Sequence, residues 1–374
     1  MEKNIGIIGG GNIGTAVAIE LTHKKYNVFL CTSHPDKFKN PLVLIDEDFN
    51  TTLSENIYSV SSSYDYMLKN CNIIIVTMPS NVFNSLNKTL MENHVKNKTF
   101  IILPGTGGSE FVFKDLLLQN NNIIGLQRVP AVYRLKEYGK IATISGRKKD
   151  GLYACSMPKL KEEYVITLIE NLFGLHCQIL PNYLNVTLTP SNPILHTTRL
   201  YSLFSKHDKD FAYTRNPYFY REWDLESSKI LIACNNELMK VKDVLNTLDL
   251  SYVRSLLVHY ESTNEESLTN KISSIKSLSD IKSPMIEHGE FFQVDWSSRY
   301  FTADFPQGLI IIKSICLLCN ISTPNIDKVI FWYQKMAEKE YFISALGFGK
   351  DIKECNIPQN YGINSLKELI DYYK

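Results

Sequence analysis

The chain has 374 residues, of which 44% are hydrophobic and 21% charged, and this length exceeds what one hydrophobic core supports, so two globular domains are expected. Its 40 basic and 39 acidic residues give a net charge of +1, which leaves no overall field to attract nucleic acid or an anionic membrane. The first residues are typical of a strand rather than of a secretion signal, and we expect a cytoplasmic protein.

The cysteines and the most apolar stretch exclude further classes. The eight cysteines are scattered, which is typical of reduced thiols in a cytosolic protein rather than of a disulfide framework. Cys316 and Cys319 form a C-x-x-C without a second pair at zinc spacing, so we expect thiols in a helical core and no metal site. Residues 308–320 are strongly apolar but are interrupted by Lys313, so no membrane-spanning helix is expected.

A glycine-rich turn separates the first predicted strand, residues 4–8, from an apolar-faced helix. Gly9, Gly11 and Gly14 have the spacing G-x-G-x-x-G: the first permits a tight turn, the second admits a pyrophosphate, and the third lets helix and strand approach. The helix N-terminus then faces the phosphates. The turn predicts a dinucleotide site formed by Gly9, Gly11, Asn12, Ile13 and Gly14. The alternative is a glycine turn that binds nothing.

The end of the second predicted strand indicates which dinucleotide is bound. NAD-binding folds usually place a carboxylate there to bind the ribose 2′-hydroxyl. This chain has Thr32, Ser33 and His34 instead, with Lys37 nearby, and these groups accept a 2′-phosphate that a carboxylate would repel. The sequence therefore favours NADP(H), and NAD(H) stays open because Asp36 could reach the ribose.

The alternation of strands and helices continues through the first half. Apolar strands are predicted within residues 71–80 and 99–110, and each ends in a loop. Ligands of open α/β sheets bind outside the carboxyl ends of such strands, so Pro79, Ser80 and the loop 104–108 are expected to line the nicotinamide side. For that loop, ordinary turn chemistry explains the glycines as well.

From about residue 183 the pattern becomes helical. Long segments with helical periodicity cover residues 192–206, 225–245, 248–262, 305–320 and 325–342. Residues 267–284 are rich in Ser and Lys and are interpreted as a polar connection. The predicted fold is therefore a doubly wound α/β Rossmann domain, residues 1–182, followed by an all-helical domain, residues 183–374, with a second substrate bound between them.

Two groups of residues in the helical half could carry chemistry. His196 lies one turn into a helix that Pro193 helps to start, and it is either a buried histidine with satisfied nitrogens or a proton carrier. Arg299 and Asp304 lie five residues apart beside aromatic residues, and the simpler interpretation is a structural salt bridge between them.

A third charged group, formed by Arg221, Glu222, Asp224 and Glu226, needs no catalytic explanation. Acidic side chains at the start of a helix complement its dipole, so we interpret this cluster as helix-start chemistry.

Taken together, the quoted motifs make the chain resemble the opine dehydrogenase family of the octopine and nopaline dehydrogenase type. The matching parts span nearly the whole chain and are GGGNIG, NPILH, RYFTADFPQG and STPNIDKVI. The resemblance implies an NAD(P)H-dependent reductive condensation of an amino acid amine with a 2-oxo acid such as pyruvate. The product would be an N-(1-carboxyalkyl) amino acid.

The resemblance also implies roles for single residues. The catalytic histidine of the family falls on His196, its partner carboxylate on Asp304, and the arginine that holds the keto-acid carboxylate on Arg299. The resemblance is silent on the amino-acid pocket, and Thr106 and Tyr201 are our candidates for contact with substrate. Further candidates for the amino-acid pocket are Tyr138, Gln127 and Trp296.

Two other hypotheses share the same scaffold. A β-hydroxyacid dehydrogenase or ketopantoate reductase-like enzyme would reduce a 2-oxo acid without an amine and would use a lysine, for which Lys229 and Lys240 are the best placed. A non-catalytic NADP(H) sensor would bind the dinucleotide without turnover, but it has no need of a His, Arg and Asp set. The helical half leaves a homodimer open.

Overall fold

Two structural units, Met1–Val186 and Thr187–Lys374, make up the chain in the computed structural model, which describes residues 2–55 and 57–374. The boundary expected after residue 182 lies close to this division. Each unit has its own core and is described separately.

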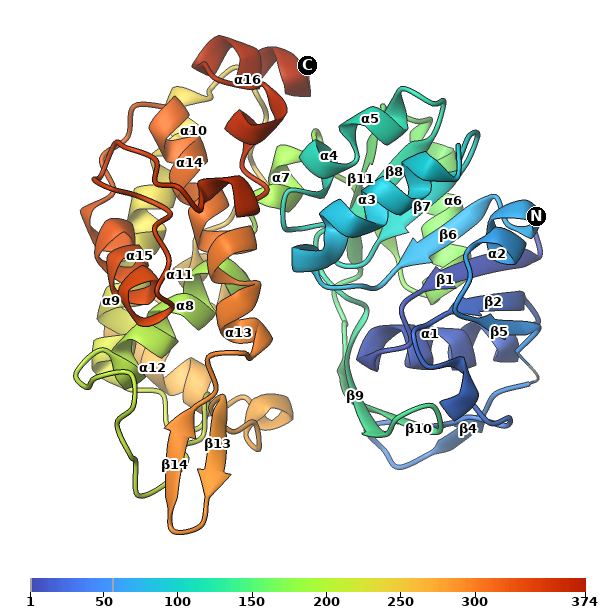
Figure 1. Ribbon diagram of the computed structural model, residues 1–374, viewed down its shortest axis with the longest axis horizontal. Coiled ribbons are helices and arrows are strands. Elements are labelled where there is room, and N and C mark those ends of the chain that lie inside the picture. The colour runs from blue at the N-terminus through green and yellow to red at the C-terminus, as the bar shows by residue number, and fades with distance from the viewer. Residues whose placement is uncertain (1, 56) are drawn as a thin grey trace. The chain divides into compact units, whose positions relative to one another are not determined.

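An eight-stranded sheet forms the centre of the first unit, in the order β12-β11-β8-β7-β6-β1-β2-β5 (Figure 1). Its strands are β1 Asn4–Ile8, β2 Asn27–Cys31, β5 Ser59–Ser61, β6 Ile73–Val76, β7 Thr99–Ile102, β8 Asn122–Leu126, β11 Leu152–Met157 and β12 Cys177–Ile179. The six strands from β5 to β8 run parallel, and β11 is antiparallel to β8. The chain winds outward in both directions from β1, which confirms the predicted doubly wound fold.

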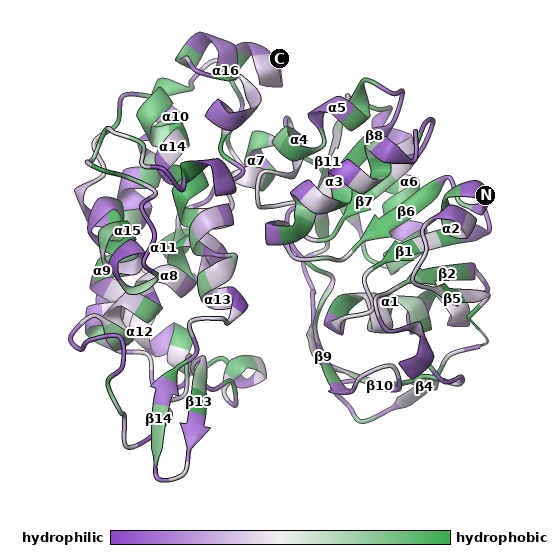
Figure 2. Ribbon diagram, viewed as in Figure 1, coloured by the Kyte–Doolittle hydropathy of each residue, from purple (hydrophilic) through white to green (hydrophobic). Residues whose placement is uncertain are grey.

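The parallel strands are almost continuously apolar because helices cover both of their faces. The helices of this unit are α1 Asn12–His23, α2 Asp65–Asn70, α3 Phe83–Glu92, α4 Ser109–Val112, α5 Lys114–Leu117, α6 Glu162–Phe173 and α7 Leu184–Thr187. Buried side chains of α1 and α6 join those of the central strands in one core cluster. Helices α3, α4 and α5 lie together over the sheet in Figure 1, and Figure 2 shows its strands as strongly hydrophobic.

A smaller sheet, in the order β4-β3-β10-β9, packs against α1. Its strands are β3 Val43–Ile45, β4 Thr51–Leu53, β9 Ala131–Glu137 and β10 Ile141–Arg147. The apolar patterns of residues 122–139 and 141–148 are typical of strands, and β9 and β10 lie within them. The side chain of Asn12 ties this sheet to the glycine turn, because its Oδ1 accepts the N–H of Leu135 at 2.9 Å.

The second unit is built mainly of helices. They are α8 Ser191–Phe204, α9 Leu225–Met239, α10 Val241–Val244, α11 Leu256–His259, α12 Glu265–Ser273, α13 Arg299–Thr302, α14 Ile310–Leu318, α15 Pro324–Met336 and α16 Leu366–Tyr373. Helix α9 packs against α8, α12 and α15, and its N-terminus is capped by Asp224, whose carboxylate accepts the N–H of Ser227 at 2.7 Å. The helix-start interpretation of Asp224 is therefore confirmed.

Three segments of this unit differ from the sequence-based expectation. A hairpin of β13 Met285–His288 and β14 Phe291–Val294 is added to the helical domain. Residues 248–262 are helical only over α11, because the Asp249 carboxylate accepts the N–H of Ser251 and forms a turn instead. The supposed connection 267–284 is partly helical, since α12, which begins at Glu265 after a capping box of Asn264 and Ser267, extends into it as far as Ser273.

One stretch, Arg299–Leu318, is long and apolar enough to cross a membrane by length and composition alone, but 78% of its apolar window is buried inside the protein. Lys313 lies in this stretch with its side chain 2% exposed, and its ammonium group is 2.7 Å from the Asp327 carboxylate. The Thr323 hydroxyl accepts a further hydrogen bond from Lys313 at 2.7 Å. The stretch is a core helix whose one buried charge is paired.

Candidate active site

The turn between β1 and α1 has the geometry that a dinucleotide requires. Gly9 has φ +109°, a backbone conformation that side chains disfavour. A methyl group on Gly14 would lie 1.8 Å from the Gly9 carbonyl oxygen, so only glycine allows this close approach. A methyl group on Gly11 would meet nothing within 4 Å, and Gly11 thus leaves open the place where a pyrophosphate approaches. These residues fit NAD(P)H.

At the end of β2, the three residues expected to meet the ribose differ in exposure. Thr32 is buried, and its hydroxyl lies 2.9 Å from the Tyr138 hydroxyl. Ser33 and His34 are exposed, and the His34 ring packs edge-on against Tyr138 at 6.1 Å. Thr32 therefore supports the turn, and Ser33 and His34 are the side chains available to a 2′-phosphate. Tyr138, a candidate for the amino-acid pocket, lies at this ribose end.

The loops after β6 and β7 are held mainly by turn interactions. Pro79 and Ser80 are partly buried, and Ser80 begins a short helical turn. The Ser109 hydroxyl donates to the carbonyl of Gly105 at 2.7 Å, which fixes the second loop. Thr106 is partly buried in that loop, at the carboxyl end of β7.

In the second unit, helix α8 places His196 between two polar partners. The His196 side chain is 12% exposed, and its Nδ1 lies 2.8 Å from Oδ2 of Asp304. Its Nε2 lies 2.8 Å from the hydroxyl of Tyr220. A carboxylate only accepts, so Nδ1 carries the proton and Nε2 of the neutral ring accepts the Tyr220 O–H. The structure thus brings together the histidine and the aspartate that the sequence analysis paired.

Asp304 reaches His196 because the helix after it approaches α8 closely. The segment Phe305–Leu309 is a wide turn, in which the N–H of Leu309 donates to the Asp304 carbonyl at 2.9 Å. Such turns interrupt helices and often occur at functional sites. A methyl group on Gly308 would lie 3.1 Å from Cβ of Pro193, one turn before His196, so glycine at this position permits the approach.

Aromatic rings surround the imidazole. The Tyr300 ring lies 4.7 Å from the His196 ring, and the Phe219 ring meets it edge-on at 5.7 Å. Tyr220 itself is 7% exposed. The proton-carrying group thus lies in a partly dry, apolar environment, which strengthens its hydrogen bonds.

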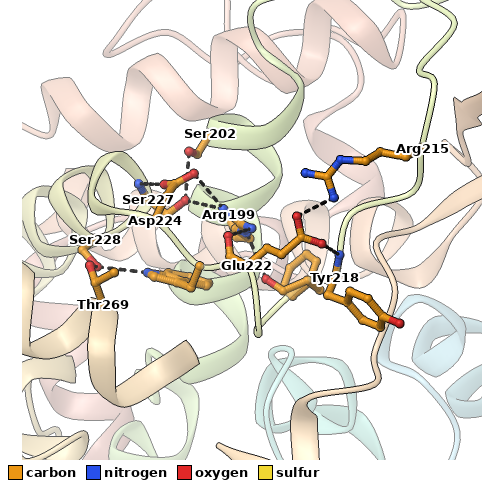
Figure 3. Close-up of polar contacts among 11 residues, drawn as sticks. Arg199, Ser202, Arg215, Tyr218, Glu222, Asp224, Ser227, Ser228 and Thr269 are labelled. Carbon is orange, nitrogen blue, oxygen red and sulfur yellow. Dashed lines mark hydrogen bonds and ion pairs between the residues drawn. The ribbon is translucent and has the colours of Figure 1, made fainter. Parts of the chain in front are cut away.

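A buried arginine anchors the segment that carries Tyr220. Arg199 is 1% exposed, and it lies one turn after His196 on α8. Its guanidinium donates to the carbonyls of Phe219 at 3.0 Å and Glu222 at 2.6 Å, and it also contacts Asp224 and Ser227 (Figure 3). Burial lowers the pKa of Arg199, and the charge of Asp224 opposes that shift. Arg199 thus fixes the backbone on both sides of Tyr220.

Arg299 begins α13 and is exposed. It forms no ion pair with any residue in the ranges 2–55 and 57–374. The salt bridge with Asp304 considered in the sequence analysis is absent there, because Asp304 binds His196. Arg299 is therefore an available cation, and its backbone carbonyl accepts the N–H of Asp304 at 3.3 Å.

Other candidate residues have structural contacts. The Tyr201 ring packs edge-on against Trp332 at 5.5 Å. Tyr201 follows His196 by five positions on α8, so the two side chains lie on different faces of this helix. The amide of Gln127 donates to the Asn185 carbonyl at 2.9 Å, and the Trp296 indole donates to the Lys209 carbonyl at 3.3 Å.

The lysines considered for a β-hydroxyacid enzyme lie outside this site. Lys229 forms an exposed pair with Glu226 one turn away on α9. Lys240 is exposed at the C-terminal end of the same helix. Neither lysine contacts His196 or Asp304.

Comparison with known proteins matches both units to models of nucleotide-dependent oxidoreductases. Residues 179–337, which include His196, Arg299 and Asp304, match the family described as NAD/NADP octopine/nopaline dehydrogenase, alpha-helical domain. Residues 4–103 match the family described as NADP oxidoreductase coenzyme F420-dependent. The helical unit of the chain is thus similar to that of the octopine and nopaline dehydrogenases.

Several opine-forming dehydrogenases are similar to the chain over most of their length. Octopine dehydrogenase of Pecten maximus is 25% identical over 83% of this chain and 81% of its own. Tauropine dehydrogenase of Arabella iricolor is 25% identical over 97% of this chain and 99% of its own. A solved octopine dehydrogenase structure with NADH and L-arginine has a TM-score of 0.84 at 22% identity, over 99% of this chain and 98% of that one. The chain is an opine dehydrogenase-like NAD(P)H oxidoreductase.

Two residues of the site, Tyr220 and Arg199, were not identified from the sequence. Tyr220 lies in a different segment from His196 and Asp304, and no spacing along the chain relates it to them. The available signal was weak: an arginine one turn after the histidine on an otherwise apolar and hydroxyl-bearing helix. An unexplained charge on a buried helix indicates a partner elsewhere.

Proposed function

We propose that the chain catalyses the NADPH-dependent condensation of an amino acid amine with a 2-oxo acid such as pyruvate, which yields an N-(1-carboxyalkyl) amino acid. The observation that carries the proposal is the 2.8 Å contact between His196 and Asp304, with Arg299 available on the same helical unit. The octopine dehydrogenase structures with L-arginine and with pyruvate support this substrate class.

In this proposal each side chain has one task. His196 takes the proton that an ammonium group must lose before its nitrogen attacks the 2-oxo carbon, and Asp304 stabilises the resulting imidazolium. Arg299 binds the carboxylate of the 2-oxo acid in a bidentate manner and so fixes the orientation of the prochiral carbon. When bound at the Gly9–Gly14 turn, the reduced nicotinamide supplies the hydride for the reduction.

The preference for NADP(H) follows from the end of β2. Ser33 and His34 are exposed there, and Lys37 lies within 5.8 Å of the Tyr138 ring that also contacts His34. A hydroxyl, an imidazole and an ammonium group suit a 2′-phosphate, and none of them repels it.

The decisive experiment crosses amino acids with 2-oxo acids and follows NADPH and NADH oxidation. We expect oxidation only when an amine and a 2-oxo acid are both present. His196→Gln should lower kcat by roughly 10²-fold or more, since general acid–base catalysis contributes about that much. Its matched control is His207→Gln, because His207 is exposed and stacks on Phe211 rather than on the site.

Three outcomes would contradict the proposal. Oxidation with a 2-oxo acid alone, at the same rate without amine, would indicate a β-hydroxyacid dehydrogenase. NADPH binding without turnover, for every pair of amino acid and 2-oxo acid, would indicate a sensor. A His196→Gln variant as active as the wild type would remove the histidine from the mechanism.

A further inference from the structure

Both ring nitrogens of His196 are occupied within the helical unit. Nδ1 is held by Asp304 at 2.8 Å, and Nε2 is held by the Tyr220 hydroxyl at 2.8 Å. Only Nε2 can exchange protons with a substrate, because Nδ1 must remain protonated to keep its bond to the carboxylate. Any proton that leaves the imidazole therefore meets the oxygen of Tyr220 first.

Hydrogen bonds to the backbone around Tyr220 fix its position beside His196. Arg199 binds the carbonyl before it, on Phe219, and the carbonyl of Glu222 shortly after it. The N–H of Phe219 also donates to the Ile281 carbonyl at 2.8 Å. Movement of this segment would leave the buried Arg199 guanidinium without its hydrogen-bond partners, which is energetically costly.

The anchoring network extends beyond Arg199. Glu222 accepts the N–H of Tyr218 at 2.8 Å and pairs with Arg215 at 2.5 Å, as Figure 3 shows. Asp224 binds Arg199 and caps α9 at the same time. Both ends of the short segment with Tyr220 are thus tied to helices of the unit, and its side chain has little freedom to leave Nε2.

From this geometry we propose that Tyr220 is a catalytic residue, whose hydroxyl relays protons between Nε2 of His196 and the condensing substrates. The inference rests on the proposed function and adds a residue that contacts the reacting atoms. Asp304, His196 and Tyr220 then form one hydrogen-bonded chain.

The proton transfers through Tyr220 balance both when the amine adds and when water leaves. When the amine adds to the 2-oxo carbon, the ammonium proton passes to the Tyr220 oxygen while the Tyr220 proton passes to Nε2, which leaves a neutral phenol and an imidazolium. The adduct still carries a second proton on its positive nitrogen and a negative oxygen, and the same hydroxyl moves that proton from nitrogen to oxygen, which gives a neutral carbinolamine. When water leaves, the C–O bond breaks with its electron pair on the hydroxyl oxygen, which takes the Tyr220 proton, and the Nε2 proton returns to the phenol. The nitrogen lone pair forms the C=N bond, and Tyr220 and His196 end neutral.

The test compares Tyr220→Phe with Tyr218→Phe. Tyr218 lies two residues earlier, and its ring is 3.5 Å from both Arg221 and Lys282, contacts that phenylalanine retains. We expect Tyr220→Phe to lower kcat by roughly 10²-fold with NADPH affinity unchanged and the thermal midpoint only slightly lower, because Nε2 loses a buried partner. Tyr218→Phe should behave as the wild type. An equal or higher kcat in Tyr220→Phe would show that the hydroxyl only blocks Nε2, and would overturn the relay.

A second measurement separates a relay from a supporting contact. Difluorotyrosine at position 220 keeps the ring and the hydroxyl but makes the hydroxyl more acidic, so a relay changes kcat and its solvent isotope effect, whereas a purely structural contact changes neither. In ¹⁵N-histidine-labelled protein, Tyr220→Phe should move the Nε2 resonance of His196, and an unmoved resonance would refute the contact. The kinetic tests require a wild type that turns over. If the wild type itself is inactive, the proposed function fails. If the wild type is active and the changes at Tyr220 have no effect, only the relay fails.

Discussion

At the scale of single residues, Ser33 and His34 are the side chains in our proposal that select the dinucleotide. A carboxylate at the end of β2 would bind the 2′-hydroxyl of NADH and repel the 2′-phosphate of NADPH. We therefore expect Ser33→Asp to lower the ratio of kcat/KM for NADPH over NADH by about tenfold or more, roughly 1.4 kcal/mol. Steady-state kinetics with both cofactors measure this ratio.

The control adds the same charge to the same unit away from the ribose. Ser85 is exposed on α3, and Ser85→Asp should leave the cofactor ratio unchanged. If both variants shift the ratio equally, general electrostatics rather than the position of Ser33 would explain the preference. If Ser33→Asp has no effect, the dinucleotide is selected elsewhere.

The residues of the site differ in how far they could be predicted. His196, Arg299 and Asp304 were identified because their order and spacing along the chain carry the family resemblance. Tyr220 was not, because its contact with His196 depends on Arg199 and on the fold of the segment between them. The exposure of Ser33 and the burial of Thr32 also depend on which way each side chain of a strand end points.

At the scale of elements, the contact between Gly308 and Pro193 sets the distance between two helices and hence between Asp304 and His196. A methyl group at Gly308 would already lie only 3.1 Å from Cβ of Pro193, which is a tight contact. Valine adds two more methyl groups, and overpacking of this kind costs about 1–3 kcal/mol. We expect Gly308→Val to lower the thermal midpoint and to reduce kcat by at least about tenfold, because a 1 Å misplacement can cost more than that.

Gly308→Ala serves as the graded control, with a smaller loss in both measurements. NADPH binding, measured by fluorescence, should stay unchanged in both variants because the glycine turn lies in the other unit. A valine variant with wild-type kcat would mean that this contact does not position Asp304.

Elements with strong short-range signals were predicted, and elements that depend on distant partners were not. The strands β1, β6 and β7 and the helices α8, α14 and α15 have long apolar patterns and clear ends. The hairpin of β13 and β14 is mostly exposed, so its pattern lacks a buried face to mark it. Helix α12 was missed although Asn264 and Ser267 carry its capping signal.

At the scale of the whole molecule, all eight cysteines are free and buried. Burial raises the pKa of Cys31 to about 11 and that of Cys71 to about 12, so thiolate is scarce near neutral pH. We expect the native protein to react slowly with DTNB at pH 8, and all eight thiols to react at once in guanidinium chloride. The absorbance of the released thiolate follows both reactions.

An introduced exposed thiol calibrates this experiment. Ser85→Cys should react rapidly in the native protein, since Ser85 is exposed on α3. Fast labelling of several native thiols in the unmodified chain would show that one of the two units opens frequently in solution.

The buried ion pair of Lys313 with Asp327 has a consequence for the chain during its synthesis. Asp327 lies after Lys313 in the sequence, so the lysine is a bare charge when the apolar stretch Arg299–Leu318 first leaves the ribosome. A lysine near the centre of a helix raises the free energy of bilayer insertion by about 2.5–3.5 kcal/mol. This cost opposes insertion of the stretch into a bilayer. In the folded protein, α15 supplies the carboxylate that pairs with the same lysine.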